Sequence, residues 1–169
     1  AWTYAPVSPK EINEEIEWLS IEEALERNKK EPRKIFIDVY TDWCGWCKKM
    51  DKNTFQHPEI SKELAKNYYA VKFNAEQKED INFAGQTFKF VAQGKRGYHE
   101  FAIALTNNKL SYPTVVFLDE NLQMIQPIPG YQEAKNFHPI LEYFASNQYK
   151  TTAWQDFMKT YKSPTSISK

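Results

Sequence analysis

The sequence has little cysteine, no excess charge of either sign and no long apolar run, and each shortage excludes a class of protein. Only two of its 169 residues are cysteines, Cys44 and Cys47, which is too few for the disulfide scaffold of a small secreted domain. Lysine plus arginine (22) equals aspartate plus glutamate (22). This balance argues against nucleic acid or an anionic membrane as the main partner. No apolar run approaches the roughly 18 residues of a membrane span.

Aromatic residues, in contrast, are abundant. They make up 15% of the chain, which is enough to build a core despite a mean hydropathy of -0.69, so a disordered chain is excluded. The length predicts one domain over residues 1–169. Residues 1–9 lack the basic and apolar segments of a signal peptide. Because the chain starts without Met, a removed leader is compatible with the sequence.

Hydrophobic spacing predicts alternating strands and helices. We expect strands at 35–40, 69–74, 112–118 and 123–128, and a β-hairpin over 81–91 that turns at 84–86. We expect helices at 21–30, after Cys47, after 58, and at 98–105, 137–144 and 154–161. Capping-box patterns at Ser20 and Thr152 mark two helix starts. Pro139 is tolerated only in a first turn, which places the start of its helix just before it.

The two cysteines lie on the turn between a predicted strand and a predicted helix. Zinc would need four ligands, and the chain adds only His57, His99 and His138, scattered singly and interpreted as structural. A disulfide closing so short a loop stabilises little. A helix N-terminus, however, lowers a cysteine pKa from about 8.5 to between roughly 3.5 and 7.5. Redox chemistry is therefore the favoured interpretation, with metal binding and an incidental pair as alternatives.

The motif Trp43-Cys44-Gly45-Trp46-Cys47-Lys48 resembles the Trp-Cys-Gly-x-Cys-Lys active site of the thioredoxin superfamily. Other family positions are matched by Asp38 (buried carboxylate), Lys72 (its paired lysine), Tyr112-Pro113 (cis-proline) and Gly130 (glycine after the last hairpin strand). The resemblance covers residues 33–146. It implies a thioredoxin-like three-layer α/β/α sandwich, an α/β fold with a central mixed sheet.

A narrower resemblance points to the C-terminal domain of the DsbD thiol:disulfide interchange proteins and to one-domain bacterial thioredoxin-like proteins. It is carried by Thr54-Phe55, by Pro58-Glu59 and by the lead-in Trp18-Leu19-Ser20 with Ala24. Those relatives mostly work in the periplasm as reductants. The resemblance therefore implies a bacterial protein that is periplasmic or secreted, with the cytoplasm as the alternative.

The sequence departs from the family in three places. The family's Gly-Pro dipeptide is replaced by Gly45-Trp46, so its reduction potential cannot be transferred. The segment before Pro113 is roughly twenty residues longer than usual, which predicts an insertion at about 77–97 ahead of the cis-proline, and long insertions are commonly functional. A further helix at about 152–162 extends the C-terminal end of the fold.

Thiol chemistry assigns roles to three residues, and the resemblance adds a fourth. Cys44, nearer the helix start and the surface, is the predicted attacking thiolate, and the more buried Cys47 resolves the mixed disulfide. A buried thiol needs a base, and a carboxylate of raised pKa suits that task. Asp38 lies in an apolar strand and is the predicted base, while Lys72 is its partner by resemblance; solvent-facing strand residues are the alternative for both.

The predicted substrate-binding residues surround the thiol: Trp43, Gly45, Trp46, Tyr112 and Pro113. Both tryptophans could be ordinary core aromatics, but Trp46 lies in the turn, where side chains tend to face outward. Pro113 would offer a backbone edge to an incoming peptide.

Together these features predict a thiol–disulfide oxidoreductase that reduces protein disulfides. It needs no cofactor and no metal, because the cysteine pair is the redox group. The expected partners are protein disulfides and an upstream thiol reductant, with no nucleic acid and no membrane span, and the expected state is a monomer. The alternatives are a disulfide oxidase or isomerase, or a non-catalytic binding module that docks a partner through the 81–91 insertion and the last helix.

Overall fold

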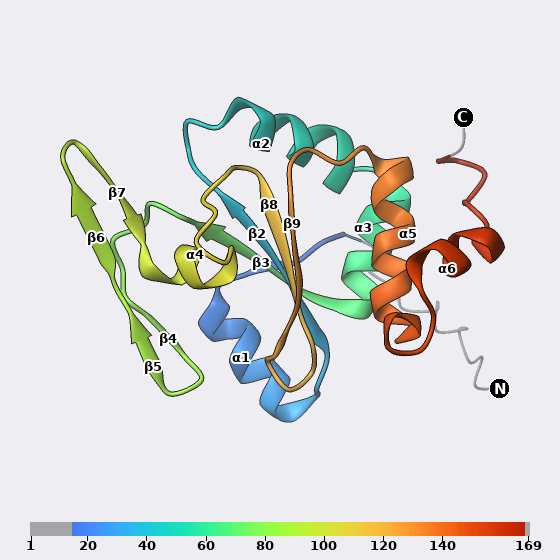
Figure 1. Ribbon diagram of the computed structural model, residues 1–169, viewed down its shortest axis with the longest axis horizontal. Coiled ribbons are helices and arrows are strands. Elements are labelled where there is room, and N and C mark those ends of the chain that lie inside the picture. The colour runs from blue at the N-terminus through green and yellow to red at the C-terminus, as the bar shows by residue number, and fades with distance from the viewer. Residues whose placement is uncertain (1–14, 168–169) are drawn as a thin grey trace, which may run out of the picture.

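A five-stranded mixed sheet runs through the middle of the computed structural model, which describes residues 15–167 (Figure 1). Its strands, in spatial order, are β1 (Trp18–Leu19), β3 (Tyr68–Asn74), β2 (Lys34–Tyr40), β8 (Thr114–Leu118) and β9 (Met124–Pro129). The first three are parallel, and β8 and β9 each run antiparallel to the preceding neighbour. Six of the seven residues of β2 are buried, because this central strand is covered on both faces.

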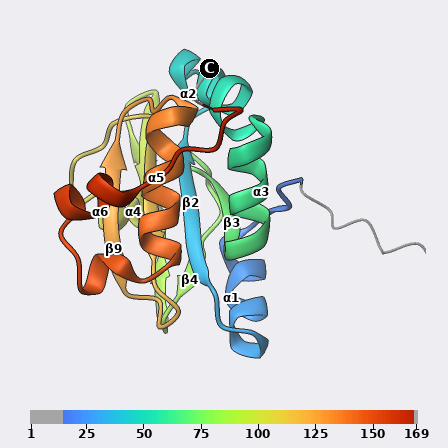
Figure 2. The ribbon, with the colours of Figure 1, turned by 90° about the vertical axis from the view of Figure 1, so that its right-hand side faces the viewer.

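Helices cover both faces of the sheet. On one face lie α1 (Ile21–Lys30) and α4 (Glu100–Leu105), and on the other lie α2 (Gly45–Met50), α3 (Pro58–Asn67) and α5 (Ala134–Ala145). Figure 2 shows α3 and α5 side by side in front of the sheet. Side chains alternate along β2, so Ile35 and Ile37 join one core and Phe36 the other. The predicted three-layer α/β/α sandwich is confirmed.

Several predicted helix starts are confirmed by their caps. The Ser20 hydroxyl accepts the Glu23 N–H, and Glu23 Oε1 accepts the Ser20 N–H, both at 3.1 Å, which completes the capping box of α1. Pro58 occupies the first turn of α3. The helix after the cysteines continues from α2 into a π-helical segment, Asp51–Phe55, which periodicity did not predict.

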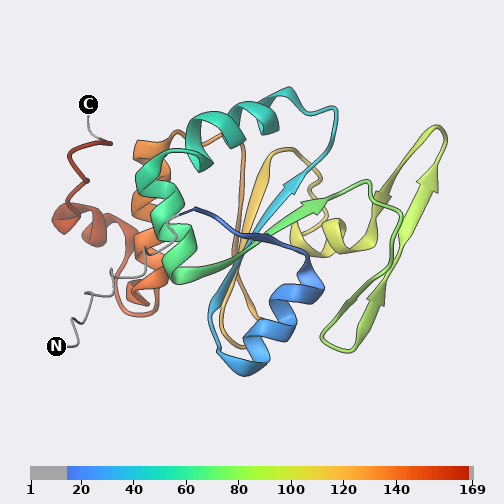
Figure 3. The same cartoon turned by 180° about the vertical axis from the view of Figure 1, so that it is seen from behind.

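The insertion contains two β-hairpins rather than the one predicted. β4 (Ile81–Phe83) and β5 (Gln86–Phe88) form the expected hairpin. β6 (Phe90–Gln93) and β7 (Arg96–His99) form a second one around a glycine turn, so the helix predicted from residue 98 begins only at Glu100. Figure 3 shows both hairpins at the end of the molecule opposite α5. The helical spacing over 98–105 predicted too early a helix start, because the alternation of polar and apolar residues in a four-residue strand is too short to be recognised beside it.

One predicted helix start and one predicted helix cap near the C-terminal end were wrong. α5 begins at Ala134, so Pro139 lies inside the helix instead of in its first turn. α6 (Trp154–Thr160) is capped by Ala153 with no side-chain hydrogen bond, so the pattern at Thr152 makes no capping box. The Thr152 carbonyl instead accepts the Tyr143 hydroxyl of α5, which fixes the chain before α6.

Two further expectations concern membranes and targeting. In the described range, 15–167, every helix is too short or too polar to span a bilayer. Residues 1–9, where the sequence shows no signal peptide, lie outside the described residues.

β8 begins at Thr114, directly after Pro113, which agrees with the predicted strand to within two residues.

Candidate active site

The cysteine pair forms a disulfide on the turn from β2 to α2. Cys44 is the N-cap of α2, and its Cα lies 5.3 Å from that of Cys47. The Cys47 backbone N–H donates to Cys44 Sγ at 3.1 Å. Amide groups at a helix start have no intrahelical acceptor, so they stabilise negative charge placed there. When the disulfide opens, the Cys44 sulfur is therefore the one whose thiolate the backbone favours.

The two sulfur-bearing residues are nearly equally buried, whereas their tryptophan neighbours are exposed. Cys44 is 5% exposed and Cys47 3%, so the predicted contrast in exposure is negligible in the oxidised protein. Trp43 is 53% exposed and Trp46 56%. Neither is a core aromatic, and each stands at the rim of the disulfide.

Trp43 is held in place by three neighbours. Its indole N–H donates to Glu76 Oε1 at 2.7 Å, and its ring meets the Tyr112 ring edge-on at 5.9 Å between centroids. The Arg96 guanidinium lies 5.0 Å from its ring centroid, a cation–π distance. Since Arg96 belongs to the second hairpin, the insertion reaches the rim of the active site.

Trp46 packs in a second group on the α2 side. Its ring lies 5.3 Å from that of Tyr131, and Lys49 Nζ lies 4.6 Å from the Trp46 centroid. Tyr131 directly follows Gly130, whose backbone N–H donates to the Pro113 carbonyl at 2.8 Å. Gly130 has a φ of +96°, a conformation that favours glycine.

The Tyr112–Pro113 peptide bond is cis, as the resemblance implied. The contact between Tyr112 and Trp43 brings this bond beside the cysteine turn. All five predicted substrate-binding residues therefore belong to the disulfide turn or to the loop that contacts it.

Asp38 and Lys72 form the ion pair that the resemblance implied. They are directly opposite each other on β2 and β3, and Lys72 Nζ lies 2.6 Å from Asp38 Oδ2. Asp38 is 1% exposed, so it is not a solvent-facing strand residue. Lys72 Nζ also reaches Asp51 Oδ1, and it lies 4.9 Å from the ring centroids of Trp18 and Tyr40.

Burial changes the acidity of this pair. It raises the pKa of Asp38 from 3.8 to about 6, and the Lys72 charge and hydrogen bond offset only part of the effect. Burial alone would lower the Lys72 pKa, but the Asp38 and Asp51 carboxylates outweigh it and leave that pKa raised. Among the described residues, Asp38 Oδ1 has no hydrogen-bond partner. Asp38 can therefore take up a proton near neutral pH.

Sequence reasoning missed five residues of the site: Lys49, Asp51, Glu76, Arg96 and Tyr131. Asp51 lies one helical turn after Cys47, and Tyr131 directly follows Gly130, so their positions in the sequence could have indicated that both lie near the site. Glu76 and Arg96 had none, because their positions depend on the path of the insertion.

The histidines lie apart from the cysteine turn. His57 caps α3 and His99 caps α4 through their ring nitrogens, which confirms a structural role for both. His138 lies on α5.

The chain is similar in sequence to known proteins. The human Spermatogenesis-associated protein 20 is 28% identical over 102 residues, covering 60% of this chain and 11% of that protein. The thiol:disulfide interchange protein DsbD of Haemophilus ducreyi is 27% identical over 89 residues, covering 53% of this chain and 12% of DsbD. The chain thus spans only about a tenth of the length of these relatives.

The solved structure of a thioredoxin-fold protein from Helicobacter pylori superposes with a TM-score of 0.60 at 16% identity, covering 89% of each chain, which shows a shared fold. The resemblance to DsbD stated from the motifs is confirmed by the sequence match. A family model described as a thioredoxin-like domain matches residues 21–145. The chain belongs to the thioredoxin-like family.

Proposed function

We propose that this protein reduces disulfide bonds of other proteins through Cys44 and Cys47. The observation that carries the proposal is the Cys44–Cys47 disulfide at the start of α2, with the Cys47 N–H directed at Cys44 Sγ. A sulfur in this position is a stabilised thiolate when reduced and a good target for a second thiol when bonded.

The proposed reaction proceeds in two exchanges. The Cys44 thiolate attacks one sulfur of a substrate disulfide, forming a mixed disulfide and releasing the other substrate sulfur as a thiolate. The Cys47 thiolate then attacks Cys44 Sγ, which closes the Cys44–Cys47 disulfide and releases the second substrate thiolate. The substrate gains two electrons and the protein loses two, and an upstream thiol reductant restores the dithiol.

Asp38 is the proposed base for the second exchange. Cys47 is buried, and a buried thiol keeps its proton more strongly than an exposed one. A carboxylate with a pKa near 6 and one oxygen without a hydrogen-bond partner is ionised at pH 7 and able to accept that proton. Lys72 is a positioning residue that orients the Asp38 carboxylate.

The proposal includes the setting of the reaction. The electrons pass through the two sulfurs, so the reaction as written requires no cofactor. The partners are disulfide-bonded proteins and a thiol reductant, the protein acts as a monomer, and it works in the periplasm or outside the cell, with the cytoplasm as the alternative. A bacterial source is part of the same proposal, and the sequence relatives include a human protein.

Two measurements test the direction of electron flow. The reduced protein is incubated with insulin as a model disulfide substrate, and its equilibrium potential is measured in glutathione buffers. We expect catalytic reduction of insulin and a potential below that of the glutathione couple. A potential well above it, with oxidation of reduced substrates, would establish an oxidase instead. Neither reduction nor oxidation of substrates, together with partner binding that survives removal of both cysteines, would establish a binding module.

Arg96 should contribute to substrate affinity because it stacks on the exposed Trp43 ring. We expect Arg96→Ala to raise KM for a protein disulfide by about threefold, with kcat unchanged, since a cation–π contact is worth roughly 0.5–1 kcal/mol at an exposed site. Lys95→Ala in the same turn is the matched control. Equal KM values for both variants would show that the second hairpin does not serve substrate binding.

Trp46 occupies the position where the family has proline, and its backbone N–H lies in the first turn of α2. This additional donor near Cys44 favours the thiolate and hence makes the couple more oxidising. We expect Trp46→Pro to be more reducing by about 30 mV, measured by equilibration in the same glutathione buffer. A potential equal to or above that of the wild type would contradict the argument and leave Trp46 as a surface residue only.

A further inference from the structure

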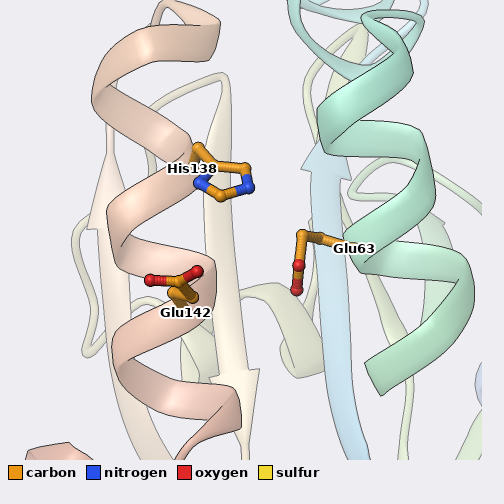
Figure 4. A group of neighbouring side chains, drawn as sticks. All are labelled: Glu63, His138 and Glu142. Atoms are coloured by element: carbon orange, nitrogen blue, oxygen red, sulfur yellow. The ribbon is translucent and has the colours of Figure 1, made fainter. Parts of the chain in front are cut away.

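A histidine and two glutamates converge between α3 and α5, and none of them belongs to the cysteine site. His138 and Glu142 lie one turn apart on α5, and Glu63 lies on α3; one ligand atom of each falls within 4.8 Å of the others. Figure 4 shows the His138 ring and the Glu63 carboxyl group projecting into the space between the two helices. Residues four apart on a helix share a face, which explains why His138 and Glu142 lie close together.

His138 is oriented as a ligand would be. It is only 2% exposed, and its Nδ1 lies 2.7 Å from the Tyr161 hydroxyl. When Nδ1 holds the ring proton and donates it to Tyr161, Nε2 keeps a lone pair available for a cation. A hydrogen bond on the second ring nitrogen is the usual support of a metal-bound histidine.

The charges around the cluster favour a bound cation. Glu63 and Glu142 are both half-buried, and within residues 15–167 neither makes a salt bridge to lysine or arginine. Glu63 accepts a hydrogen bond from Asn67 Nδ2 at 2.7 Å, which orients its carboxylate without neutralising it. Two neighbouring carboxylates repel each other unless a positive charge lies between them.

We propose that Glu63, His138 and Glu142 bind one divalent transition-metal ion, with Zn²⁺ as the best match. One imidazole nitrogen and two carboxylates form a three-ligand zinc set, and a water molecule completes a tetrahedron. Mg²⁺ and Ca²⁺ prefer oxygen ligands alone, so the histidine discriminates against them.

Binding requires a small contraction of the cluster. Ligand atoms about 2.0–2.2 Å from zinc lie roughly 3.3–3.6 Å from one another in a tetrahedron, against the present spread of up to 4.8 Å. Both glutamates are partly exposed and can turn about their side-chain bonds, while His138 stays fixed by Tyr161. The ion would join α3 to α5, and the hydrogen bond between His138 and Tyr161 already connects α5 to the end of α6.

The test uses the oxidised protein, because its disulfide keeps the Cys44 and Cys47 thiolates from binding zinc. After treatment with a chelator, Zn²⁺ is added and followed by calorimetry and by thermal unfolding. We expect one Zn²⁺ per chain and a higher Tm. Glu63→Gln and Glu142→Gln should each weaken binding at least tenfold, and Tyr161→Phe by about tenfold, as expected for loss of a group that orients a ligand.

Two controls and four overturning outcomes make the test decisive. His57→Gln at the N-cap of α3 and Glu26→Gln on α1, both outside the cluster, should bind Zn²⁺ as the wild type does. Equal affinity in all variants, or no binding, would overturn the proposal, and so would equal competition by Mg²⁺. A loss of Tm in Glu142→Gln that is the same with and without Zn²⁺ would also overturn it, since it would indicate a pair with protonated His138. Insulin reduction is read separately, so this test does not depend on the proposed function.

Discussion

The Cys47→Ser variant, incubated in its reduced form with a disulfide-bonded protein, should accumulate a covalent mixed disulfide through Cys44. The first exchange still occurs, because the Cys47 backbone N–H that supports Cys44 Sγ remains in the variant. The second exchange lacks its nucleophile, so the complex persists. Non-reducing electrophoresis and mass spectrometry detect it, and catalytic reduction of insulin should fall to the uncatalysed rate.

The Cys44→Ser variant is the matched control. We expect it to lose all catalytic reduction and to trap no complex, because Cys47 lacks the helix-start position that stabilises a thiolate. Cys44 is 5% exposed and Cys47 3%, so accessibility does not distinguish them. Which cysteine attacks first therefore depends on the stabilisation of the Cys44 thiolate at the start of α2. Trapping by Cys44→Ser in place of Cys47→Ser would reverse the assigned roles.

Asp38→Asn should make the protein more stable at pH 7 and slower in its second exchange. The folded protein raises the pKa of Asp38 from 3.8 to about 6, so it holds that proton more tightly than the unfolded chain. This contribution to stability is fully present below pH 3.8 and is lost as the pH rises through about 6. At about 1.4 kcal/mol for each pKa unit, the buried charge costs about 3 kcal/mol at pH 7, which asparagine avoids.

Chemical denaturation at pH 4 and pH 7 measures the first effect. The free energy of unfolding of Asp38→Asn should exceed that of the wild type by on the order of 2–3 kcal/mol at pH 7 and by much less at pH 4. Asp51→Asn is the control, because Asp51 also pairs with Lys72 but is far less buried. An equal increase in the free energy of unfolding at both pH values would show that the change in stability does not come from the titration of Asp38.

Kinetics measures the second effect. Release of substrate from the mixed disulfide should be about a hundredfold slower in Asp38→Asn at pH 7, the lower end of a general base's contribution. In the wild type this rate should rise with pH through about 6, and in the variant that rise should be absent. A wild-type rate in the variant would remove Asp38 from the mechanism.

The sequence allowed the centre of the fold and the redox turn to be predicted, because their determinants are local. The apolar run of β2 specifies a buried strand, and Ser20 with Glu23 specifies the start of α1. The spacing of Cys44 and Cys47 and the proline at 113 identify the position of the redox-active turn. Asp38 and Lys72 were paired by resemblance, and the parallel register of β2 and β3 provides the physical reason.

What could not be predicted depends on contacts between distant segments. Arg96 reaches Trp43 only because the second hairpin folds back toward the cysteine turn. His138 meets Glu63 only because α3 and α5 pack side by side on one face of the sheet. The predicted start of α5 just before Pro139 was wrong, because the packing of α5 on the core outweighs a single missing amide hydrogen bond.

The two hairpins of the insertion pair only within themselves among the described strands and share no ladder hydrogen bonds with the central sheet. Their loop sequences can therefore diverge without shifting the strand register that holds Asp38 and Lys72 in place. Because the second hairpin carries Arg96 to the rim of the disulfide, changes in its turn would alter the surface beside the disulfide while the central sheet keeps its register.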